Sequence, residues 1–242
     1  MSRRRVSSLT KRLSTGGDRL LLVTAHPDDE TLFFSPLLLS LKASAAGSGA
    51  SAASCPAVRV LCLSTGNFYG QGERRRDELH SACSRHFGLD PHCVHALDEE
   101  GLQDGFDKVW AADAVAALVL EHARDADVVV TFDEYGVSGH PNHIATFVGV
   151  RRALEMRRQQ GGSGALLGLK LHSTSALRKF AGVLDVPYSL LAGGGETYFV
   201  LNHNVLAVLL ALLEHRSQLQ WYRIAFVLLS RFSYINTFSA IV

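Results

Sequence analysis

Three short apolar runs, separated by segments of helical length, limit the possible folds more than any other feature of this sequence. The runs cover residues 20–25, 58–63 and 128–132. Apolar residues without alternating polar ones are typical of strands buried on both faces of a sheet. Helical patterns cover about 31–42, 73–87, 107–122 and 143–158. Strands that alternate with helices predict an α/β fold, here a Rossmann-like, mostly parallel sheet with helices on both faces.

The rest of the chain continues this pattern less regularly. Further strands are predicted near 167–172 and 197–201, and a helical pattern starts at about Asn204. Two stretches rich in small residues, 43–57 and 159–164, are expected to be surface loops because they can bury little apolar area. The longest uncharged segment has 17 residues, against the ~20 that a spanning helix needs, so no transmembrane helix is predicted.

Length and composition predict one folded domain after a short tail. The chain has 242 residues, of which 47% are hydrophobic and 19% are charged, which suits a packed core and argues against disorder. Residues 1–18 are basic and lack the apolar stretch of a secretory signal, so we expect a disordered tail there. A transit peptide or a lipid-attracted arm is the alternative. Residues 19–242 are predicted to form a single domain.

Charge and cysteine content exclude further classes of protein. Lys and Arg number 24 against 23 Asp and Glu, so no overall basic field is available to bind nucleic acid. The four cysteines, Cys55, Cys62, Cys83 and Cys93, fit no Cys-x-x-Cys pattern for zinc or redox chemistry. We expect reduced thiols, as in a cytosolic environment.

A histidine and three acids follow the first predicted strand directly, in the sequence His26-Pro27-Asp28-Asp29-Glu30. Sites in open parallel sheets form at the carboxyl ends of strands. If a helix begins near Thr31, His26 and Asp29 can converge on one point, while Asp28 projects elsewhere. The alternative is that the aspartates only cap a helix, which contributes about 0.3–1 kcal/mol. Adjacent acids at the end of a buried strand are costly without a cation, so we favour a metal site.

A second histidine cluster follows the third strand, within residues 136–143 (GVSGHPNH). His140 and His143 can face one cavity if a helix begins near Pro141. Three protein ligands with an open fourth position are typical of catalytic zinc. A bound metal lowers the pKa of water to about 7, a carboxylate takes the proton, and a donor stabilises the oxyanion. The two clusters together therefore predict amide or ester hydrolysis.

These two segments also carry a family resemblance. Residues 21–30 (LLVTAHPDDE) and 131–143 (TFDEYGVSGHPNH) resemble the LmbE-like, metal-dependent de-N-acetylases of N-acetylglucosaminyl substrates. Residues 63–79, 184–190 and 215–238 resemble a narrower group within that family. That group deacetylates N-acetylglucosaminyl-phosphatidylinositol in the second step of glycosylphosphatidylinositol (GPI) anchor synthesis. The resemblance covers about residues 20–238.

The resemblance implies a role for each residue of the two clusters. His26, Asp29 and His143 would bind Zn²⁺, and Asp28 would be the general base. His140 would be the cationic stabiliser of the oxyanion and a general acid for the leaving amine; a merely structural histidine is the alternative. Ser138 stands where relatives that act on soluble sugars have a tyrosine.

Three more residues are predicted to bind substrate. Arg75 and Glu78 lie at the start of a helix after a glycine-rich loop, where backbone N–H groups and an arginine can meet an anion. The family uses this region near the sugar, and the glycolipid brings a phosphodiester. Asp104 can accept hydrogen bonds from sugar hydroxyls, although an Asp-Gly turn explains it equally well.

The C-terminal segment, about 215–242, is predicted to contact a membrane. Its aromatic residues are interleaved with Arg216, Arg223 and Arg231, as in interfacial helices. A core helix with an arginine edge fits the pattern equally, and the lipid substrate favours the membrane. Enzymes of the narrower group commonly begin with a hydrophobic anchor, whereas this chain begins with the basic tail, so we expect peripheral attachment or a missing anchor. The resemblance implies the cytosolic face of the endoplasmic reticulum (ER).

The leading hypothesis is therefore a zinc-dependent deacetylase of the inositol glycolipid. A deacetylase of a soluble N-acetylglucosamine conjugate and a non-catalytic lipid-binding relative are the alternatives. A nucleotide-binding Rossmann protein is disfavoured, because no Gly-x-Gly-x-x-Gly follows the first strand.

Overall fold

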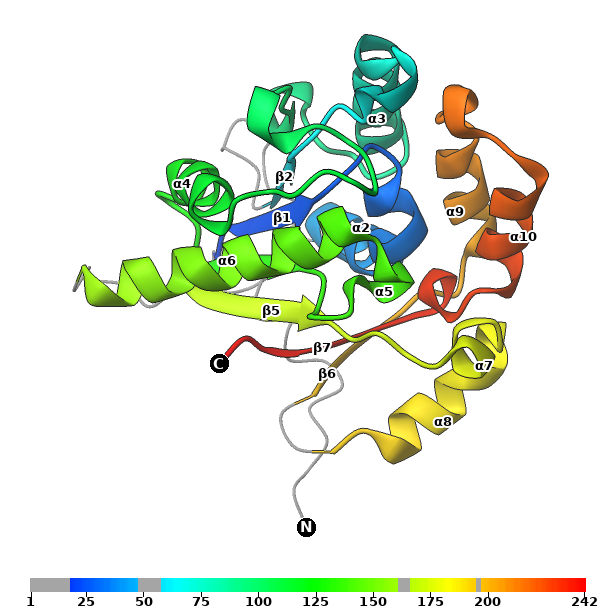
Figure 1. Cartoon of the computed structure of the whole chain (residues 1–242). Coiled ribbons are helices and arrows are strands. Elements are labelled where there is room, and N and C mark those ends of the chain that lie inside the picture. Colours follow the sequence, from blue (N-terminus) through cyan, green and yellow to red (C-terminus); the bar gives the residue numbers. More distant parts are fainter. Residues whose placement is uncertain (1–17, 48–57, 161–165, 195–196) are drawn as a thin grey trace.

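The computed structural model describes residues 18–47, 58–160, 166–194 and 197–242. The predicted tail up to residue 17, residues 48–57 of the first predicted loop and residues 161–165 around the end of the second lie outside the described residues. The predicted α/β fold is confirmed: a seven-stranded, mostly parallel sheet lies between helices (Figure 1).

The sheet has the strand order β3-β2-β1-β4-β5-β7-β6. Its strands are β1 (Leu20–Thr24), β2 (Val58–Cys62), β3 (Val94–Ala96), β4 (Val128–Thr131), β5 (Leu167–Leu171), β6 (Tyr198–Leu201) and β7 (Ile235–Ala240). Strands β1 to β5 pair in parallel, and β7 pairs antiparallel to both β5 and β6. Strand β1 lies in the interior of the sheet: Leu22 lies between Val60 of β2 and Val130 of β4. All five residues of β1 are buried, as its apolar run predicts.

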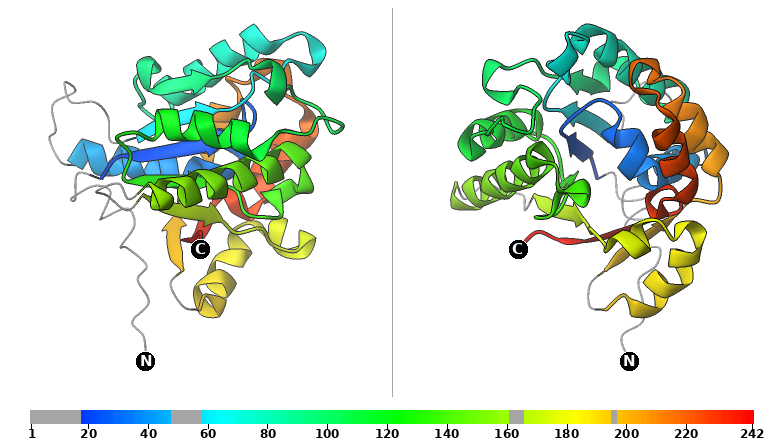
Figure 2. Two further views of the ribbon diagram at one scale, coloured as in Figure 1. Left: turned by 60° about the vertical axis from the view of Figure 1, so that its left-hand side comes forward. Right: turned by 45° about the vertical axis from the view of Figure 1, so that its right-hand side comes forward.

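Helices cover both faces of the sheet. The longer ones are α2 (Asp29–Gly47), α3 (Gly72–Arg85), α4 (Ala112–His122), α6 (Pro141–Gln159), α8 (Asp185–Ala192), α9 (Val205–Leu212) and α10 (Trp221–Leu229). Helices α4 and α6 lie on one face, and α2, α3, α9 and α10 lie on the other (Figure 2). Gly149 of α6 directly faces Val115 of α4, where a methyl group would overlap the valine side chain, so these two helices pack closely.

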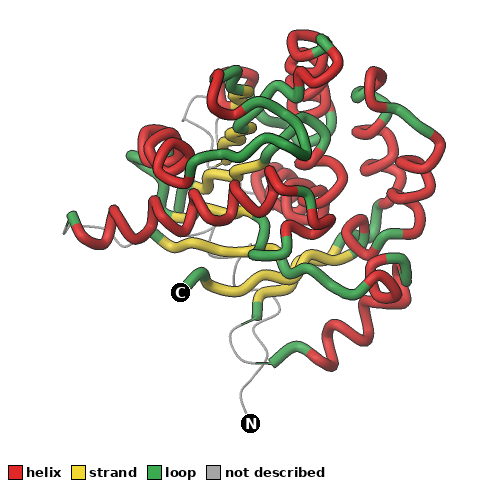
Figure 3. Tube along the Cα trace, in the orientation of Figure 1, coloured by secondary structure: helices red, strands yellow, loops and turns green. Residues whose placement is uncertain are grey.

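Short helical turns complete the chain and are visible among the loops (Figure 3). They are α5 (Gly136–Gly139), α7 (Ala176–Lys179), η1 (Asn67–Tyr69), η2 (Pro91–Cys93), η3 (Glu100–Leu102), η4 (Gly182–Leu184), η5 (Arg216–Gln218) and η6 (Arg231–Ser233). Within the described ranges, none of the helices combines the length and apolar character needed to cross a bilayer.

The structure corrects four sequence predictions. Residues 43–47 of the first predicted loop continue helix α2, and α4 begins at Ala112 rather than near residue 107. Strand β3 has only three residues, too few to show a periodicity, and it was missed. The helical pattern predicted from Asn204 onward ends at Leu229, and β7 follows. Its sequence INTFSA carries a weak strand signal, and pairing with β5 and β6 fixes its conformation.

Part of the C-terminal segment belongs to the core, and the segment is not one interfacial helix. Phe232 and Phe238 are fully buried, and so is Arg231. The guanidinium of Arg231 donates hydrogen bonds to Asp185 and Ser189 instead of facing solvent. The prediction that Arg231 contacts lipid phosphates is therefore wrong, because a charge with no exposed surface cannot reach a membrane.

Removing the buried cation should destabilise the fold. We expect Arg231→Met to lower the free energy of unfolding by about 3–5 kcal/mol, because Asp185 would lose a partner in a site that is 2% exposed. Urea unfolding followed by circular dichroism measures this change. The exposed Arg216 gives a matched control, for which Arg216→Met should change stability by no more than about 0.5 kcal/mol. Equal effects of the two substitutions would contradict the assignment.

The same ion pair predicts a direction for acid unfolding. Burial alone would raise the pKa of Asp185, but hydrogen bonds from Arg178, Ser189 and Arg231 lower it. A carboxyl group whose pKa is lower in the folded state stabilises the protein above its unfolded-state pKa of about 3.9, and loses this contribution as the pH falls further. The stability difference between the wild type and Arg231→Met should therefore shrink below about pH 4.

Candidate active site

The His26–Asp29 turn joins the end of β1 to helix α2. Asp29 is the first residue of α2, and its Oδ2 accepts the backbone N–H groups of Ala25 at 3.0 Å and His26 at 2.8 Å. The carboxylate thus fixes the turn that carries His26. Its other oxygen, Oδ1, lies 3.2 Å from Nε2 of His143. Asp29 is therefore both a structural residue of this turn and a link to the second cluster.

The second cluster is held by the start of helix α6. Nδ1 of His143 lies 3.0 Å from the carbonyl oxygen of Gly136, which can only accept, so Nδ1 carries a proton. The ring also stacks on Phe132, with centroids 4.2 Å apart and the planes 2° from parallel. Gly136 has φ 61°, and a Cβ there would lie 2.8 Å from Cβ of His143, so glycine is required for this approach. These contacts fix the ring with Nε2 directed at Asp29.

The structure brings both histidine clusters together. Within the described chain, His26, His140 and His143 form a group whose ligand nitrogens all lie within 4.8 Å of one another. The ring centroids of His26 and His143 are 5.5 Å apart. The Nδ1–H of His143 donates a hydrogen bond to the carbonyl oxygen of Gly136. In a neutral His143 ring, Nε2 therefore has no proton and directs its lone pair at the Asp29 carboxylate. Two electron donors 3.2 Å apart need a proton or a cation between them, and roughly 3.3 Å also separates neighbouring ligands around tetrahedral zinc.

Charge coupling between these groups appears in their pKa values. Burial alone would raise the pKa of Asp29, but the nearby His143 and His26 lower it below its usual value. Burial alone would lower the pKa of His143, and the Asp29 carboxylate raises it. Asp29 and His143 therefore each favour the charged form of the other.

His140 differs from the cationic residue predicted from the sequence. Burial lowers its pKa to about 4, with contributions from His26 and His143, so its imidazole is neutral near pH 7. It is the N-cap of α6, where its Nδ1 accepts the backbone N–H of Asn142 at 3.2 Å. The proton of the neutral ring then lies on Nε2. His140 can donate a hydrogen bond, but it does not supply a positive charge.

Asp28 lies in a strained turn and is 4% exposed. Its φ is 111°, a value that residues other than glycine rarely adopt. Its backbone N–H donates to Oε2 of Glu30 at 3.0 Å, and its carboxylate contacts Nη1 of Arg223 in α10. The contact with Arg223 was not predicted, since that arginine was assigned to the membrane surface. An adjacent guanidinium favours the ionised form of the carboxyl group.

The strain at Asp28 gives a stability prediction. We expect Asp28→Gly to be about 1 kcal/mol more stable than Asp28→Ala, because glycine adopts a φ near 111° without steric cost. Both variants lack the carboxylate, so the loss of the Arg223 contact cancels in the comparison. Thermal unfolding of the two purified variants measures the difference. An alanine variant as stable as the glycine variant would show that this turn relaxes freely.

Glu30 and His215 form a buried pair behind this turn. Both side chains are 0% exposed, and Nε2 of His215 lies 2.7 Å from Oε1 of Glu30. The other Glu30 oxygen accepts the Asp28 N–H, so the pair supports the turn that holds Asp28. His215 was not singled out from the sequence. It lies 185 positions from Glu30, and no local pattern signals the contact.

The predicted substrate-binding residues divide into two groups. Arg75 is buried and donates hydrogen bonds to the carbonyl oxygens of Gly66 at 2.8 Å and Pro27 at 2.9 Å. Asp104 lies 3.1 Å from Nε2 of His26 and 3.5 Å from Nη1 of Arg75, so both residues adjoin the cluster. Glu78 instead accepts hydrogen bonds from Ser217 and Arg74. These hydrogen-bond partners of Glu78 are not among the predicted site residues.

Comparison with known proteins identifies relatives of this chain. The family model PIG-L, described as GlcNAc-PI de-N-acetylase, matches residues 21–154. The chain is 38% identical over 227 residues to the N-acetylglucosaminyl-phosphatidylinositol de-N-acetylase of Bos taurus, covering 93% of this chain and 84% of the relative. It is 27% identical over 258 residues to the enzyme of that name from Saccharomyces cerevisiae, covering 92% and 81%.

Solved structures resemble the fold as well. The N,N'-diacetylchitobiose deacetylase from Pyrococcus horikoshii superimposes with a TM-score of 0.56 at 14% identity, covering all of this chain (100%) and 94% of that protein. At this identity the similarity concerns the fold.

Proposed function

The chain belongs to the PIG-L family of GlcNAc-PI de-N-acetylases, and from this membership we propose that it hydrolyses the N-acetyl group of N-acetylglucosaminyl-phosphatidylinositol. The products are glucosaminyl-phosphatidylinositol and acetate, and the reaction serves GPI-anchor biosynthesis. The observation that carries the proposal is the meeting of the two histidine clusters, with Nε2 of His143 directed at Asp29. Amide hydrolysis needs a water nucleophile, a base and an oxyanion donor, and candidates for the base and the donor surround this point.

His26, Asp29 and His143 are the proposed ligands of a divalent cation, for which we propose Zn²⁺. Two imidazoles and a carboxylate are ligands that zinc prefers, and the Nδ1–H bond of His143 to Gly136 is the outer contact that commonly orients such a histidine. When bound, the cation supplies Lewis-acid activation of water and of the amide carbonyl.

Asp28 is the proposed general base. It adjoins the ligand Asp29, yet its strained turn directs its carboxylate at Arg223. Contact with the guanidinium keeps the carboxyl group ionised at neutral pH and therefore able to accept a proton from the attacking water. The same proton can then pass to the departing amine of glucosamine.

His140 is proposed to donate a hydrogen bond to the carbonyl oxygen as it becomes an oxyanion. Its Nδ1 accepts a hydrogen bond from the Asn142 N–H. The proton of the neutral ring is therefore on Nε2, which can donate it in a hydrogen bond to the substrate. The ring centroid is 4.9 Å from that of His26 and 5.2 Å from that of His143, which places this donor beside the proposed ligands. A neutral donor stabilises negative charge without needing protonation at neutral pH.

Asp104 and Arg75 are proposed to contact the sugar side of the substrate. The side chain of Asp104 is 15% exposed, and its carboxylate can accept hydrogen bonds from hydroxyl groups. Arg75 donates hydrogen bonds to the carbonyl oxygens of Gly66 and Pro27, so we propose that it fixes the loop after β2 against the His26–Asp29 turn as well as contacting substrate. Substrate binding by Glu78 stays a prediction.

The partner that this activity implies is a lipid. We propose that the enzyme works at the cytosolic face of the ER membrane, where the inositol glycolipid is held by its acyl chains. The C-terminal segment contributes Trp221 and Tyr222 to the surface, with 78% and 53% exposure. Aromatic residues of this kind suit the headgroup region of a bilayer.

A deacetylation assay on purified protein tests the proposed function. Acetate release from N-acetylglucosaminyl-phosphatidylinositol should stop after chelation and return when Zn²⁺ is added. A water-soluble N-acetylglucosamine conjugate serves as the comparison substrate. Equal rates on both substrates would replace the glycolipid assignment with the soluble one. Full activity after complete metal removal would overturn metal dependence, and no activity on either substrate would favour a non-catalytic relative.

A further inference from the structure

Exposed apolar residues are concentrated in the segment from α7 through η4 to α8, which we call the α7–α8 face. Six large apolar residues there are between 53% and 86% exposed: Leu177, Phe180, Val183, Leu184, Tyr188 and Leu191. Single exposed apolar residues are common on protein surfaces, but six within one short segment form a patch that marks an interaction site. These six residues lie outside the C-terminal segment 215–242, whose helix α10 adjoins them.

Helix α10 extends this face to the active site. The rings of Phe180 and Phe226 are 6.0 Å apart, which joins α7 to the middle of α10. Leu228 and Leu229, at the end of α10, are 44% and 55% exposed. Helix α10 also contacts η4, the turn between α7 and α8. Since Arg223 of the same helix contacts Asp28, the apolar surface borders the catalytic turn.

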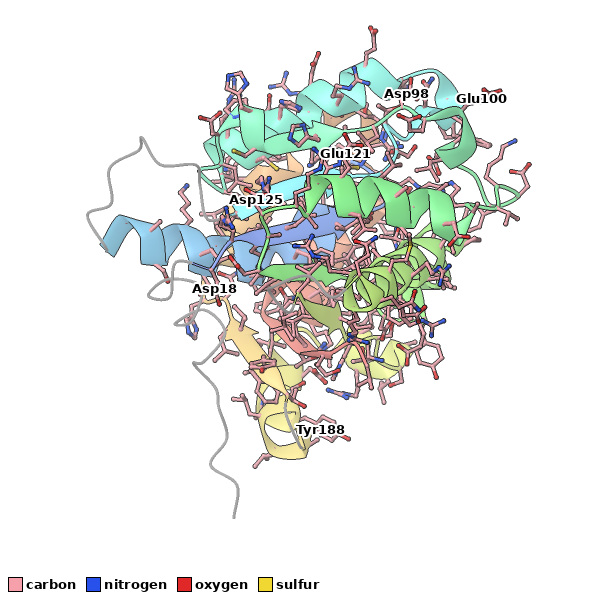
Figure 4. All side chains as sticks on the ribbon, turned by 90° about the vertical axis from the view of Figure 1, so that its left-hand side faces the viewer. Asp18, Asp98, Glu100, Glu121, Asp125 and Tyr188 are labelled. Carbon is pink, nitrogen blue, oxygen red and sulfur yellow. The ribbon has the colours of Figure 1, made fainter. Side chains whose placement is uncertain are left out.

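The charges on this face have one sign. Between Ser175 and Gly194 the only acid is Asp185, which is 2% exposed and bonded to Arg178 and Arg231. Lys179 has no anionic partner among the described residues, and burial alone lowers its pKa. Figure 4 shows Tyr188 at the far end of the molecule from the labelled acids Asp98 and Glu100. An apolar face with one unpaired lysine complements anionic lipid headgroups over acyl chains.

We propose that the α7–α8 face, together with the exposed end of α10, docks on the surface of an anionic lipid bilayer. This inference rests on the proposed function in one respect: a glycolipid substrate keeps its acyl chains in the bilayer, so its headgroup must enter the site from the membrane side.

Vesicle flotation tests the docking surface. Purified protein is mixed with phosphatidylcholine vesicles with and without phosphatidylserine. Binding should require phosphatidylserine and weaken with salt, because its charged part is screened. Leu177→Asp/Leu184→Asp should reduce binding at least about tenfold, since two apolar contacts are lost and two anions are added. Both residues are more than 75% exposed, so folding should be preserved.

A matched control distinguishes the effect of changing this face from the effect of adding negative charge to the protein. Ala114→Asp/Ala117→Asp adds the same two charges on exposed positions of α4, on the opposite side of the molecule in Figure 1, and should bind nearly as the wild type does. Equal loss in both double variants would overturn the proposal. A second outcome would also overturn the proposal. In it, the wild-type protein binds no vesicles and is a dimer, and Leu177→Asp/Leu184→Asp makes it a monomer, which would assign the face to contact with a second copy.

An activity assay tests the proposed docking surface and the proposed function separately. On a short-chain, water-dispersed form of the glycolipid, Leu177→Asp/Leu184→Asp should retain wild-type turnover, and on vesicles it should lose about as much activity as it loses binding. Wild-type binding to vesicles without deacetylation of either form would reject the proposed function and leave the docking surface standing. Deacetylation on vesicles that is unchanged in the double variant would reject the docking surface alone.

Discussion

Asp28→Asn is expected to keep the metal and to lose turnover by about 10²–10⁴-fold, the usual contribution of a general base. The amide has nearly the shape of the carboxylate and leaves the Asp29 and His143 contacts intact, but it cannot accept a proton from water. Steady-state deacetylation with metal content measured on the same sample is the test. The loss should appear in kcat with little change in KM, because Asp28 acts on the reacting water.

The control for this prediction is Asp113→Asn, the same change of acid to amide at a side chain of α4 that is 76% exposed. It alters local charge without touching Asp28 and should not reproduce the kcat effect of Asp28→Asn. Turnover of Asp28→Asn within a few-fold of the wild type would reject Asp28 as the base and direct attention to Asp104, the other acid beside His26.

Asp29→Ala is expected to abolish activity by releasing the metal. Loss of an outer contact to a ligand already costs about 10–100-fold in metal affinity, so loss of a ligand should cost more than about 100-fold. The variant also leaves the N–H groups of Ala25 and His26 without their acceptor, which should lower stability by about 1–3 kcal/mol per group. Equilibrium dialysis against Zn²⁺ and urea unfolding measure the two effects.

Asp29→Asn separates these two roles. The amide oxygen can still accept the two backbone N–H groups, so stability should stay close to that of the wild type, while the lost charge weakens metal binding. If Asp29→Asn and Asp29→Ala bound Zn²⁺ as tightly as the wild type, the third ligand would have to be His140, whose nitrogen also lies within the histidine group.

Much of the fold follows from local sequence patterns. The runs that form β1, β2 and β4 are mostly apolar, as is typical of strands buried on both faces of a sheet. Strand β7 was missed because its sequence mixes polar and apolar residues, so its conformation depends on its neighbours. The same limit applies to Arg231, whose charge indicates a surface position until Asp185 is seen beside it.

The active site divides in the same way. The sequence by itself determined that His26, Asp29, His140 and His143 would meet, because parallel strands place their carboxyl ends at one edge and these residues directly follow two of them. Only the tertiary structure decided the Arg223 contact of Asp28, the Glu30–His215 pair behind it and the neutral state of His140. The physical reason is the sequence distance between the interacting groups. Periodicity and spacing describe residues that are close in sequence, whereas charge pairing and desolvation depend on groups that folding brings together from distant parts of the chain.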